Sequence, residues 1–241
     1  MDNSKKTYVL VHGAWHGAWS FETTKQKMEQ SGSKVITFDL PGHGNDKTDI
    51  PQVTFDSYVE KVNQEIIKLN TSVILVGHSL AGFIISKVAE DMPNKVEKLV
   101  FVAAMIPNNE KTVFDTLKED AGSQLLQNLI FSEDQSWATV NEETLKKVVY
   151  NGATNEQIAE AAPQLVRQAT QPFFAPVTTT ENNFGKIPKV YIECTMDKIL
   201  SIDKQKQLAK MAVCSHSISL NTGHVPQVES PIQLAETLLS V

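Results

Sequence analysis

Residues 73–82 read VILVGHSLAG, and this stretch decides the fold of the chain. Its apolar, β-branched first half is typical of a buried strand, which stops at Gly77. Ser79 follows after one residue, with the small residues Ala81 and Gly82 on its other side. A chain that passes from strand to helix through such a turn exposes the serine hydroxyl to substrate, on a strained backbone. An ordinary loop that happens to contain serine is the alternative, so the rest of the sequence must decide.

Length and composition favour one globular domain. The chain has 241 residues, of which 41% are hydrophobic and 21% charged, as in ordinary single domains with a substantial core. The formal net charge of −6 includes no block of Lys and Arg, so we expect no nucleic-acid partner. No apolar stretch approaches the roughly 20 residues of a membrane span. The start of the chain, Met1–Lys6, lacks the features of a secretory signal.

The two cysteines, Cys194 and Cys214, have no histidine or cysteine at metal-ligand spacing. We therefore expect two free thiols, no metal site and a reducing, cytoplasmic location. The sequence does not specify an oligomeric state.

Strand-like apolar runs alternate along the chain with segments of helical periodicity. Most runs are continuously apolar, which is typical of parallel strands buried on both faces. The candidate strands are Tyr8–His12, Lys34–Phe38, Ser72–Val76, Lys98–Ala103, Lys189–Cys194 and His216–Leu220. The alternation predicts an α/β fold, a doubly wound, mostly parallel sheet of about six strands, with functional residues at the carboxyl ends of the strands.

Helical spacing of apolar residues occurs in Phe55–Leu69 and, after the serine, in Ile84–Ala89. Near the end of the chain, Ser230-Pro231-Ile232-Gln233 predicts the start of a helix with Ser230 as the capping residue.

The segment 107–186 interrupts this alternation, because it contains no convincing strand. Helical patterns occur in it at Glu142–Tyr150 and Glu156–Ala169. We therefore expect residues 1–106 and 187–241 to form one core and residues 107–186 to form a helical cap over its site. Aromatic residues in such a cap more often pack against the core than contact a ligand.

A serine hydroxyl becomes a nucleophile when a base takes its proton and a third group orients that base. His224 follows the last predicted strand, and Asp197 follows the strand before it. The chain order Ser79, Asp197, His224 is the order that serine enzymes of this architecture use.

Other residues compete for the roles of base and acid. His12, His43 and His78 lie in glycine-flanked turns, where structural hydrogen bonding suffices to explain them. His16 follows the first strand in a loop that could approach the site, and His216 begins a strand. Among the carboxylates, Glu193 lies within a buried strand and Asp203 on the following helix, so both are poorer candidates than Asp197.

The oxyanion of an acyl-transfer reaction needs two preorganised N–H donors. Leu80, directly after the serine and at a helix N-terminus, is expected to supply one of them. The loop after the first strand is expected to supply the other. There Gly13 lets the backbone bend close to the site, and Ala14 is the favoured donor. A simple tight turn is the alternative for this loop.

Several motifs resemble the α/β-hydrolase superfamily. They are VHGAWHGAW at 11–19, DLPGHG at 39–44 and GHSLAG at 77–82. Downstream segments resemble the branch that contains plant methylesterases, hydroxynitrile lyases and related bacterial esterases: IPKVYI at 187–192, Asp197-Lys198 and GHVP at 223–226. The resemblance implies Ser79 as nucleophile, Asp197 and His224 as its partners, and Ala14 and Leu80 as oxyanion donors, with no metal or organic cofactor.

The resemblance also separates two chemistries. The similar lyases carry Thr at the position of Gly13 and Lys directly after the histidine, where this chain has Val225. Without that hydroxyl and ammonium to handle cyanide, hydrolysis of a carboxylic ester is favoured over cyanohydrin cleavage. A small-ligand receptor of the same fold, with little turnover, is a third hypothesis. The family usually has Gly at the position of Ala81, but Ala is small enough to keep the turn.

The substrate pocket is expected near Gly13, Trp15, Trp137 and Val225. Trp15 and the aromatic residues of the cap favour a small-to-medium apolar ester as the partner. No Arg or Lys lies close to the motifs in the sequence to require an anionic one. The fold by itself does not specify the acyl group.

Overall fold

A computed structural model of the chain describes residues 6–108 and 111–241. Residues 1–5, which make up most of the segment predicted to lack a secretory signal, and residues 109–110 lie outside the described residues.

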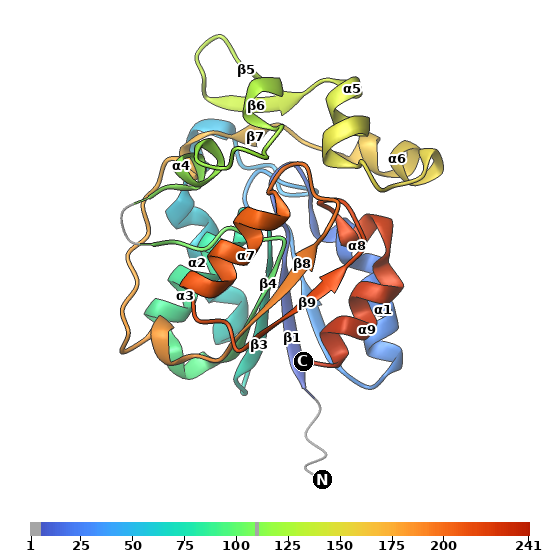
Figure 1. The fold of residues 1–241 in the computed structure, drawn as a ribbon. Helices are drawn as coiled ribbons and strands as arrows, with labels where there is room; N and C mark the ends of the chain where they lie inside the picture. The colour runs from blue at the N-terminus through green and yellow to red at the C-terminus, as the bar shows by residue number, and fades with distance from the viewer. Residues whose placement is uncertain (1–5, 109–110) are drawn as a thin grey trace.

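The core is a sheet of six strands in the order β2-β1-β3-β4-β8-β9, in which every neighbouring pair is parallel (Figure 1). The strands are β1 (Thr7–Val11), β2 (Lys34–Thr37), β3 (Val73–His78), β4 (Val96–Val102), β8 (Lys189–Cys194) and β9 (His216–Leu220). The predicted α/β fold is confirmed, and each predicted strand is present within two residues at either end. Because all strands run in one direction, the loops after β1, β3, β8 and β9 meet at one edge.

The first and last helices, α1 (Glu22–Gln30) and α9 (Pro231–Leu239), pack side by side on one face of the sheet (Figure 1). Lys27 Nζ of α1 lies 3.9 Å from a Glu236 carboxylate oxygen of α9. The core on this face joins apolar side chains of both helices to those of the strands. The two ends of the described chain therefore build the same layer.

Three other helices cover the opposite face: α2 (Phe55–Ile67), α3 (Ala81–Asp91) and α7 (Ile202–Met211). In α2 the predicted apolar stripe is buried, because it faces the sheet. The Thr54 hydroxyl accepts a hydrogen bond from the Ser57 amide, and the Ser57 hydroxyl accepts one from the Thr54 amide. This capping box fixes the start of α2.

The last helix begins at Pro231 as predicted, but the Ser230 side chain makes no capping hydrogen bond. The short helix α8 (Pro226–Glu229) ends directly before it. Ser230 therefore has φ −144° and ψ 59°, instead of the extended conformation from which a capping hydroxyl reaches back.

The cap lies above the carboxyl edge of the sheet and contains three short strands as well as helices (Figure 1). Its helices are α4 (Val113–Lys118), α5 (Glu142–Thr144) and α6 (Asn155–Ala161); its strands are β5 (Leu129–Phe131), β6 (Trp137–Val140) and β7 (Gln168–Ala169). The strands pair antiparallel in the order β5-β6-β7. The prediction that residues 107–186 contain no strand is wrong.

The two predicted cap helices are also shorter than their patterns. The first, Glu142–Tyr150, is α5 followed by a π-helical turn over Leu145–Val149. The second, Glu156–Ala169, is helical only as far as Ala161 in α6 and one 3-10 turn, and it ends in β7. Main-chain pairing with β6 converts its last residues to a strand that apolar periodicity does not signal.

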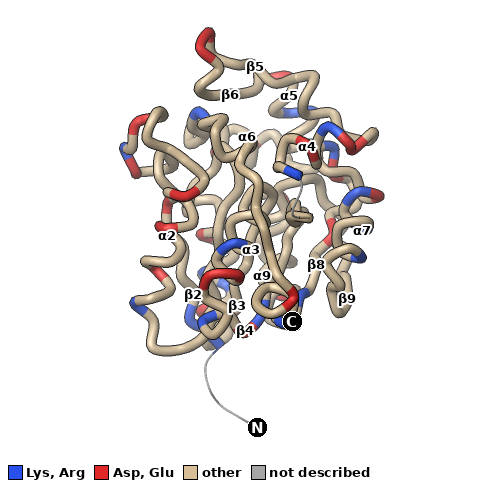
Figure 2. The backbone as a smooth tube through the Cα atoms, turned by 90° about the vertical axis from the view of Figure 1, so that its left-hand side faces the viewer, with Lys and Arg blue, Asp and Glu red and all other residues tan. Residues whose placement is uncertain are grey.

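Charged side chains of both signs are interspersed over the molecule (Figure 2). Many pair within a helix turn, as Lys61 and Glu65 do at 2.7 Å. Within residues 6–108 and 111–241, no helix combines the length and the apolar character of a membrane span. The same residues contain no group of three His, Cys, Asp or Glu side chains arranged to hold a metal ion.

Candidate active site

Ser79 lies in the sharp turn between β3 and α3 with φ 56°. A non-glycine residue in this left-handed region costs about 1–3 kcal/mol, so its surroundings must hold it there. The Ser79 amide donates to the Val102 carbonyl, and the Met105 amide donates to the Ser79 carbonyl, both at 3.2 Å. The strain predicted at the serine is thus present and is held by the chain that follows β4.

The turn also requires a glycine on the helix side of the serine. A Cβ on Gly82 would lie 2.0 Å from the Met105 carbonyl oxygen and 3.0 Å from Ala104 Cβ. Only glycine lets the start of α3 approach the end of β4 so closely.

Three residues from separate loops form a hydrogen-bonded chain at the carboxyl edge of the sheet. The Ser79 hydroxyl lies 2.8 Å from His224 Nε2, and His224 Nδ1 lies 2.7 Å from Asp197 Oδ2. A carboxylate can only accept, so Nδ1 carries the proton and Nε2 is free to accept one from the serine. All three residues are buried. This arrangement lets an imidazole take the proton of a serine nucleophile.

The Asp197 carboxylate is held by more than the histidine. Its Oδ1 accepts from the Ile199 and Leu200 amides at 2.7 and 2.9 Å. Its Oδ2 also accepts from Gln205 Nε2 of α7 at 3.2 Å. These donors fix the carboxylate that orients His224, and Gln205 is a site residue that the sequence did not reveal.

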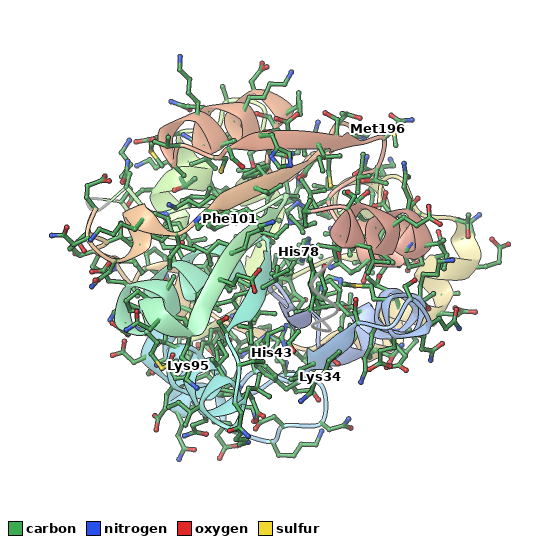
Figure 3. All side chains as sticks on the ribbon, turned by 90° about the horizontal axis from the view of Figure 1, so that it is seen from below. Lys34, His43, His78, Lys95, Phe101 and Met196 are labelled. Atoms are coloured by element: carbon green, nitrogen blue, oxygen red, sulfur yellow. The ribbon has the colours of Figure 1, made fainter. Side chains whose placement is uncertain are left out.

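His78, beside the serine, supports the loop that carries the base. Its Nε2 donates to the His224 carbonyl at 2.8 Å, and its Nδ1 accepts from Gln227 Nε2 at 3.0 Å. Figure 3, seen from below, shows His78 near the centre of the molecule, and it is buried. The structural hydrogen bonding predicted for His78 is therefore present, and Gln227 is a second residue without a sequence signal.

Two backbone amides near the serine have no hydrogen-bond acceptor in the described part of the chain. The amides of Ala14 and Leu80 donate to no acceptor within the described ranges 6–108 and 111–241. The Gly13 backbone lies against the serine turn, because a Cβ at Gly13 would lie 2.9 Å from Ser79 Cβ. Unpaired buried amides are costly and rare, so both N–H groups remain available to an acceptor from outside the chain.

His16 also approaches the site, on the loop after β1. Its Nδ1 donates to the Ala14 carbonyl at 2.8 Å, and its Nε2 accepts from the Tyr150 hydroxyl of the cap at 2.7 Å. Burial, with a smaller contribution from the neighbouring His224 ring, lowers the pKa of His16 to about 4. His16 is therefore a neutral bridge between this loop and the cap at neutral pH.

Burial of neutral histidines predicts an acid-sensitive fold. Burial lowers the pKa values of His12, His16, His43 and His78 below the ordinary value of 6.5. Below about pH 6.5 these histidines bind protons in the unfolded chain but stay neutral in the folded one. The free energy of unfolding is therefore highest above about pH 6.5 and falls as the pH drops toward about 4. For His16 alone, with a pKa of about 4, the loss at about pH 5 is about 2 kcal/mol.

Urea unfolding of wild type and His16→Gln at about pH 8 and pH 5 measures this effect. Wild type is expected to lose about 2 kcal/mol more than the variant between the two pH values. Equal losses in both proteins would show that His16 is not kept neutral by the fold.

Two small cavities flank Trp15 between core and cap. One, of about 230 Å³, is lined by Trp15, His16 and mainly apolar cap residues. The other, lined largely by aromatic side chains that include Phe114 and Phe174, is closed to about 10 Å³, less than one water needs. Both cavities adjoin the loop after β1 through Trp15, and neither lining includes Ser79, His224 or Asp197.

Two other residues predicted for the pocket, Val225 and Trp137, line neither of these cavities. Val225 is buried directly after His224, at the start of α8. Trp137 lies on β6, where the Arg167 guanidinium stacks 4.3 Å from its ring centroid. Arg167 also lines the cavity beside His16, so the cap brings to the site a cation that is remote from the motifs in the sequence.

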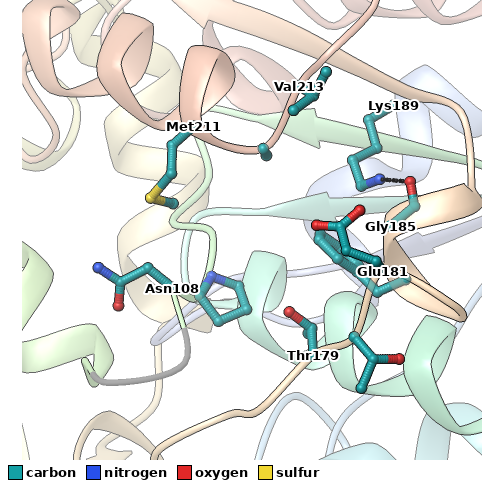
Figure 4. Close-up of a pocket in the computed structure, with 11 residues that line it drawn as sticks. Asn108, Thr179, Glu181, Gly185, Lys189, Met211 and Val213 are labelled. Carbon is teal, nitrogen blue, oxygen red and sulfur yellow. Dashed lines mark hydrogen bonds between the residues drawn. The ribbon is translucent and has the colours of Figure 1, made fainter.

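A wider cavity of about 330 Å³ lies elsewhere, between α7 and the chain leading to β8 (Figure 4). Its one lysine, Lys189, donates to the Gly185 and Ile187 carbonyls, as the dashed line to Gly185 shows in Figure 4. The lining residues include neither the serine nor its partners. The chemistry of the molecule is thus concentrated at the carboxyl edge of the sheet.

Comparison with known proteins agrees with this geometry. The sequence matches the Alpha/beta hydrolase family over residues 8–237. Methylesterase 7 of Arabidopsis thaliana is 27% identical over 252 residues, covering 99% of this chain and 97% of that protein. Salicylic acid-binding protein 2 of Nicotiana tabacum is 28% identical over 253 residues, covering 98% and 96%.

Solved structures share the fold. Tomato Methylketone Synthase I in complex with 2-tridecanone matches with a TM-score of 0.87 at 25% identity, over 98% of this chain and 97% of that one. Polyneuridine aldehyde esterase matches with a TM-score of 0.90 at 22% identity, over 98% and 99%; at that identity the likeness concerns the fold alone.

Proposed function

This chain belongs to the Alpha/beta hydrolase family, and on that premise we propose that it is a serine carboxylic ester hydrolase for small-to-medium apolar esters. The observation that carries the proposal is the hydrogen-bonded chain from Ser79 through His224 to Asp197. The relatives named as methylesterases support ester chemistry.

In the first half of the proposed reaction, Ser79 Oγ attacks the ester carbonyl carbon while His224 Nε2 takes the hydroxyl proton. Asp197 keeps the imidazole in the required tautomer and stabilises its charged form. The Ala14 and Leu80 amides donate to the oxyanion of the tetrahedral intermediate. His224 then gives its proton to the leaving alcohol, and an acyl-Ser79 remains.

In the second half, water attacks the acyl carbonyl while His224 takes one of its protons. The same two amides hold the second oxyanion. When this intermediate collapses, His224 returns the proton to Ser79 and the carboxylic acid leaves. Every proton and acyl transfer uses groups of the protein, the ester and water, so the mechanism needs no metal or organic cofactor.

The cavity between the loop after β1 and the cap supports a substrate of modest size with an apolar part. The cavity of about 230 Å³ beside His16 is below the usual range for drug-sized ligands, about 300–1,000 Å³. Most of its lining is aliphatic.

Gly13 supports ester hydrolysis over cyanohydrin cleavage. A Cβ there would lie 2.9 Å from both Ser79 Cβ and His78 Nδ1, which leaves no room for the threonine of the similar lyases. Val225, buried at 0% exposure, has no ammonium to hold cyanide.

The purified protein should be assayed with methyl, p-nitrophenyl and naphthyl esters of varied acyl length and, separately, for cyanide release from mandelonitrile. We expect ester turnover, fastest for short and medium apolar acyl groups, to exceed cyanide release. Faster cyanide release would favour the lyase. Negligible turnover of every ester, with tight binding of a small ligand by calorimetry, would favour the receptor.

We also propose a reducing, cytoplasmic location for the enzyme. Cys194 and Cys214 are free thiols, which suits a compartment that keeps cysteines reduced.

A further inference from the structure

The loop after β1 is held by side chains on both sides of its proposed oxyanion donor. The Gly13 carbonyl accepts from His12 Nδ1 at 2.9 Å, and the Ala14 carbonyl accepts from His16 Nδ1 at 2.8 Å. Both histidines come from the loop itself or its immediate flanks. The Ala14 amide lies between these two fixed carbonyls.

Trp15 is held by the cap instead. Its amide donates to Gln168 Oε1 at 3.3 Å, and its carbonyl accepts from the Val166 amide at 3.0 Å. Its indole Nε1 donates to the Ala138 carbonyl at 3.0 Å. From the Gly13 carbonyl to the Trp15 carbonyl, the Ala14 amide is thus the one polar backbone atom without a partner within the described residues.

Gln168 of β7 connects this loop to two other segments of the core. Its Oε1 also lies 3.0 Å from His43 Nε2. Its Nε2 donates to the Tyr58 hydroxyl at 3.0 Å and to the Ala169 carbonyl at 2.9 Å. Since a carbonyl can only accept, the contact with Ala169 fixes which end of the amide faces Trp15.

The orientation of Gln168 is fixed further by its burial. The side chain has 0% exposure, so no bulk water can replace a lost partner. His43 in turn lies against His12, with ring centroids 4.9 Å apart, and His12 is the donor to the Gly13 carbonyl. Gln168 therefore reaches the loop directly through Trp15 and indirectly through the two histidine rings.

The backbone of Trp15 explains why such a support is needed. Its φ of 63° lies in the left-handed region, which costs a non-glycine residue about 1–3 kcal/mol. Without an acceptor for its amide, Trp15 would relax from this conformation. The Ala14–Trp15 peptide would rotate, and through the Ala14 Cα this rotation would shift the adjoining Gly13–Ala14 peptide, which carries the Ala14 N–H.

We propose that Gln168 is a positioning residue for the oxyanion hole, acting through the Trp15 amide to aim the Ala14 N–H at the reacting carbonyl. This inference rests on the proposed ester hydrolysis. It assigns to a glutamine of the cap a part in transition-state stabilisation, although Gln168 touches neither the substrate nor the serine.

A second glutamine of the cap offers a matched control. Gln171 Oε1 accepts from the Phe55 amide at 2.7 Å, so it also joins cap to core by a side-chain hydrogen bond. Within residues 6–108 and 111–241, its side chain forms no hydrogen bond with the loop after β1. If Gln168 only anchored the cap, removal of either amide would have a similar effect on catalysis.

The experiment compares Gln168→Leu, Gln168→Glu and Gln171→Leu with wild type on one p-nitrophenyl ester. It also measures inhibition by a trifluoromethyl ketone, whose serine adduct places an oxyanion in the hole. Gln168→Leu is expected to lower kcat about 10- to 100-fold, below the cost of deleting a donor outright, and to weaken the ketone by a similar factor. KM should change less than about threefold.

The other two variants separate positioning from anchoring. Gln168→Glu keeps an acceptor oxygen for the Trp15 amide and should recover most of kcat, whereas Gln171→Leu should keep wild-type kcat within about threefold. If Gln168→Leu does not fold, Gln168→Glu alone tests the inference. Its carboxylate cannot donate to the Tyr58 hydroxyl as the amide does, but it can still accept from the Trp15 amide. Near-wild-type kcat and ketone affinity in this variant support the inference.

Three results would overturn the inference. The first is a wild-type kcat in Gln168→Leu. The second is an equal loss of kcat in Gln168→Leu and Gln171→Leu. The third is a loss of kcat in Gln168→Leu without a change in its affinity for the ketone. If Gln168→Glu is the only folded variant at this position, a kcat as low as that expected for leucine also overturns it. In each of these cases wild-type ester hydrolysis stands, whereas a wild type that hydrolyses no ester removes the proposed function and this inference together.

Discussion

Replacement of Ser79 by alanine is expected to lower ester hydrolysis about 10⁴- to 10⁶-fold, because the reaction loses its nucleophile and leaves His224 with no proton to take. A fluorophosphonate probe measures the same property without a known substrate, since it attaches covalently to an activated serine. We expect labelling of wild type and none of Ser79→Ala. The hydroxyl is small and the site is otherwise unchanged, so the variant should fold normally.

Ser86→Ala is the matched control for this experiment. Ser86 lies on α3, the helix that follows the Ser79 turn; it is fully buried and donates to the Gly82 carbonyl at 2.7 Å. It should label and hydrolyse like wild type. Equal labelling of wild type and Ser79→Ala would refute Ser79 as the nucleophile.

Gly82→Ala is expected to cost more than about 3 kcal/mol of folding free energy, a large part of the total for most domains. The new Cβ would lie 2.0 Å from the Met105 carbonyl oxygen, and the obstacle is backbone, which cannot rotate away as a side chain can. Because Met105 also binds the Ser79 carbonyl, the displaced chain should disturb the serine turn. Urea unfolding and probe labelling measure the two effects.

Ala81→Gly, one residue earlier, is the comparison. It removes a methyl group where Gly82→Ala adds one, and it should cost about 2 kcal/mol, because it lowers helix propensity and removes a fully buried methyl. A stability of Gly82→Ala equal to that of Ala81→Gly would show that the close approach of α3 to the end of β4 does not exist.

The sheet was predictable from the sequence because most of its strands are continuous apolar runs. β8 and β9 have the predicted bounds, and burial of β8 on both faces leaves a strong signal. The cap strands left no such signal. β7 has two residues, and β6 is largely half-buried, so both depend on pairing with each other.

The residues of the candidate site also fall into two groups, those with a sequence signal and those without one. Ser79, Asp197 and His224 were predictable from strand ends and chain order, since parallel strands bring those ends together. Gln168 and Gln205 were not, because an amide side chain has no spacing rule. The role of Gln168 follows from a contact between distant segments, since its bond to the Trp15 amide joins residues 153 apart. Gln205 contacts Asp197 only 8 residues away, but that contact depends on how the chain folds between β8 and α7.

The packing of α1 against α9 has a consequence for the order of folding during synthesis. His224 lies 145 residues after the serine that it binds, and α9, which covers the same layer as α1, lies later still. The ribosome therefore releases the first helix long before its neighbour exists. Until then, the apolar face of α1 and its side of the sheet stay uncovered and open to aggregation. Chaperone dependence should thus be concentrated in the interval before the last helix emerges.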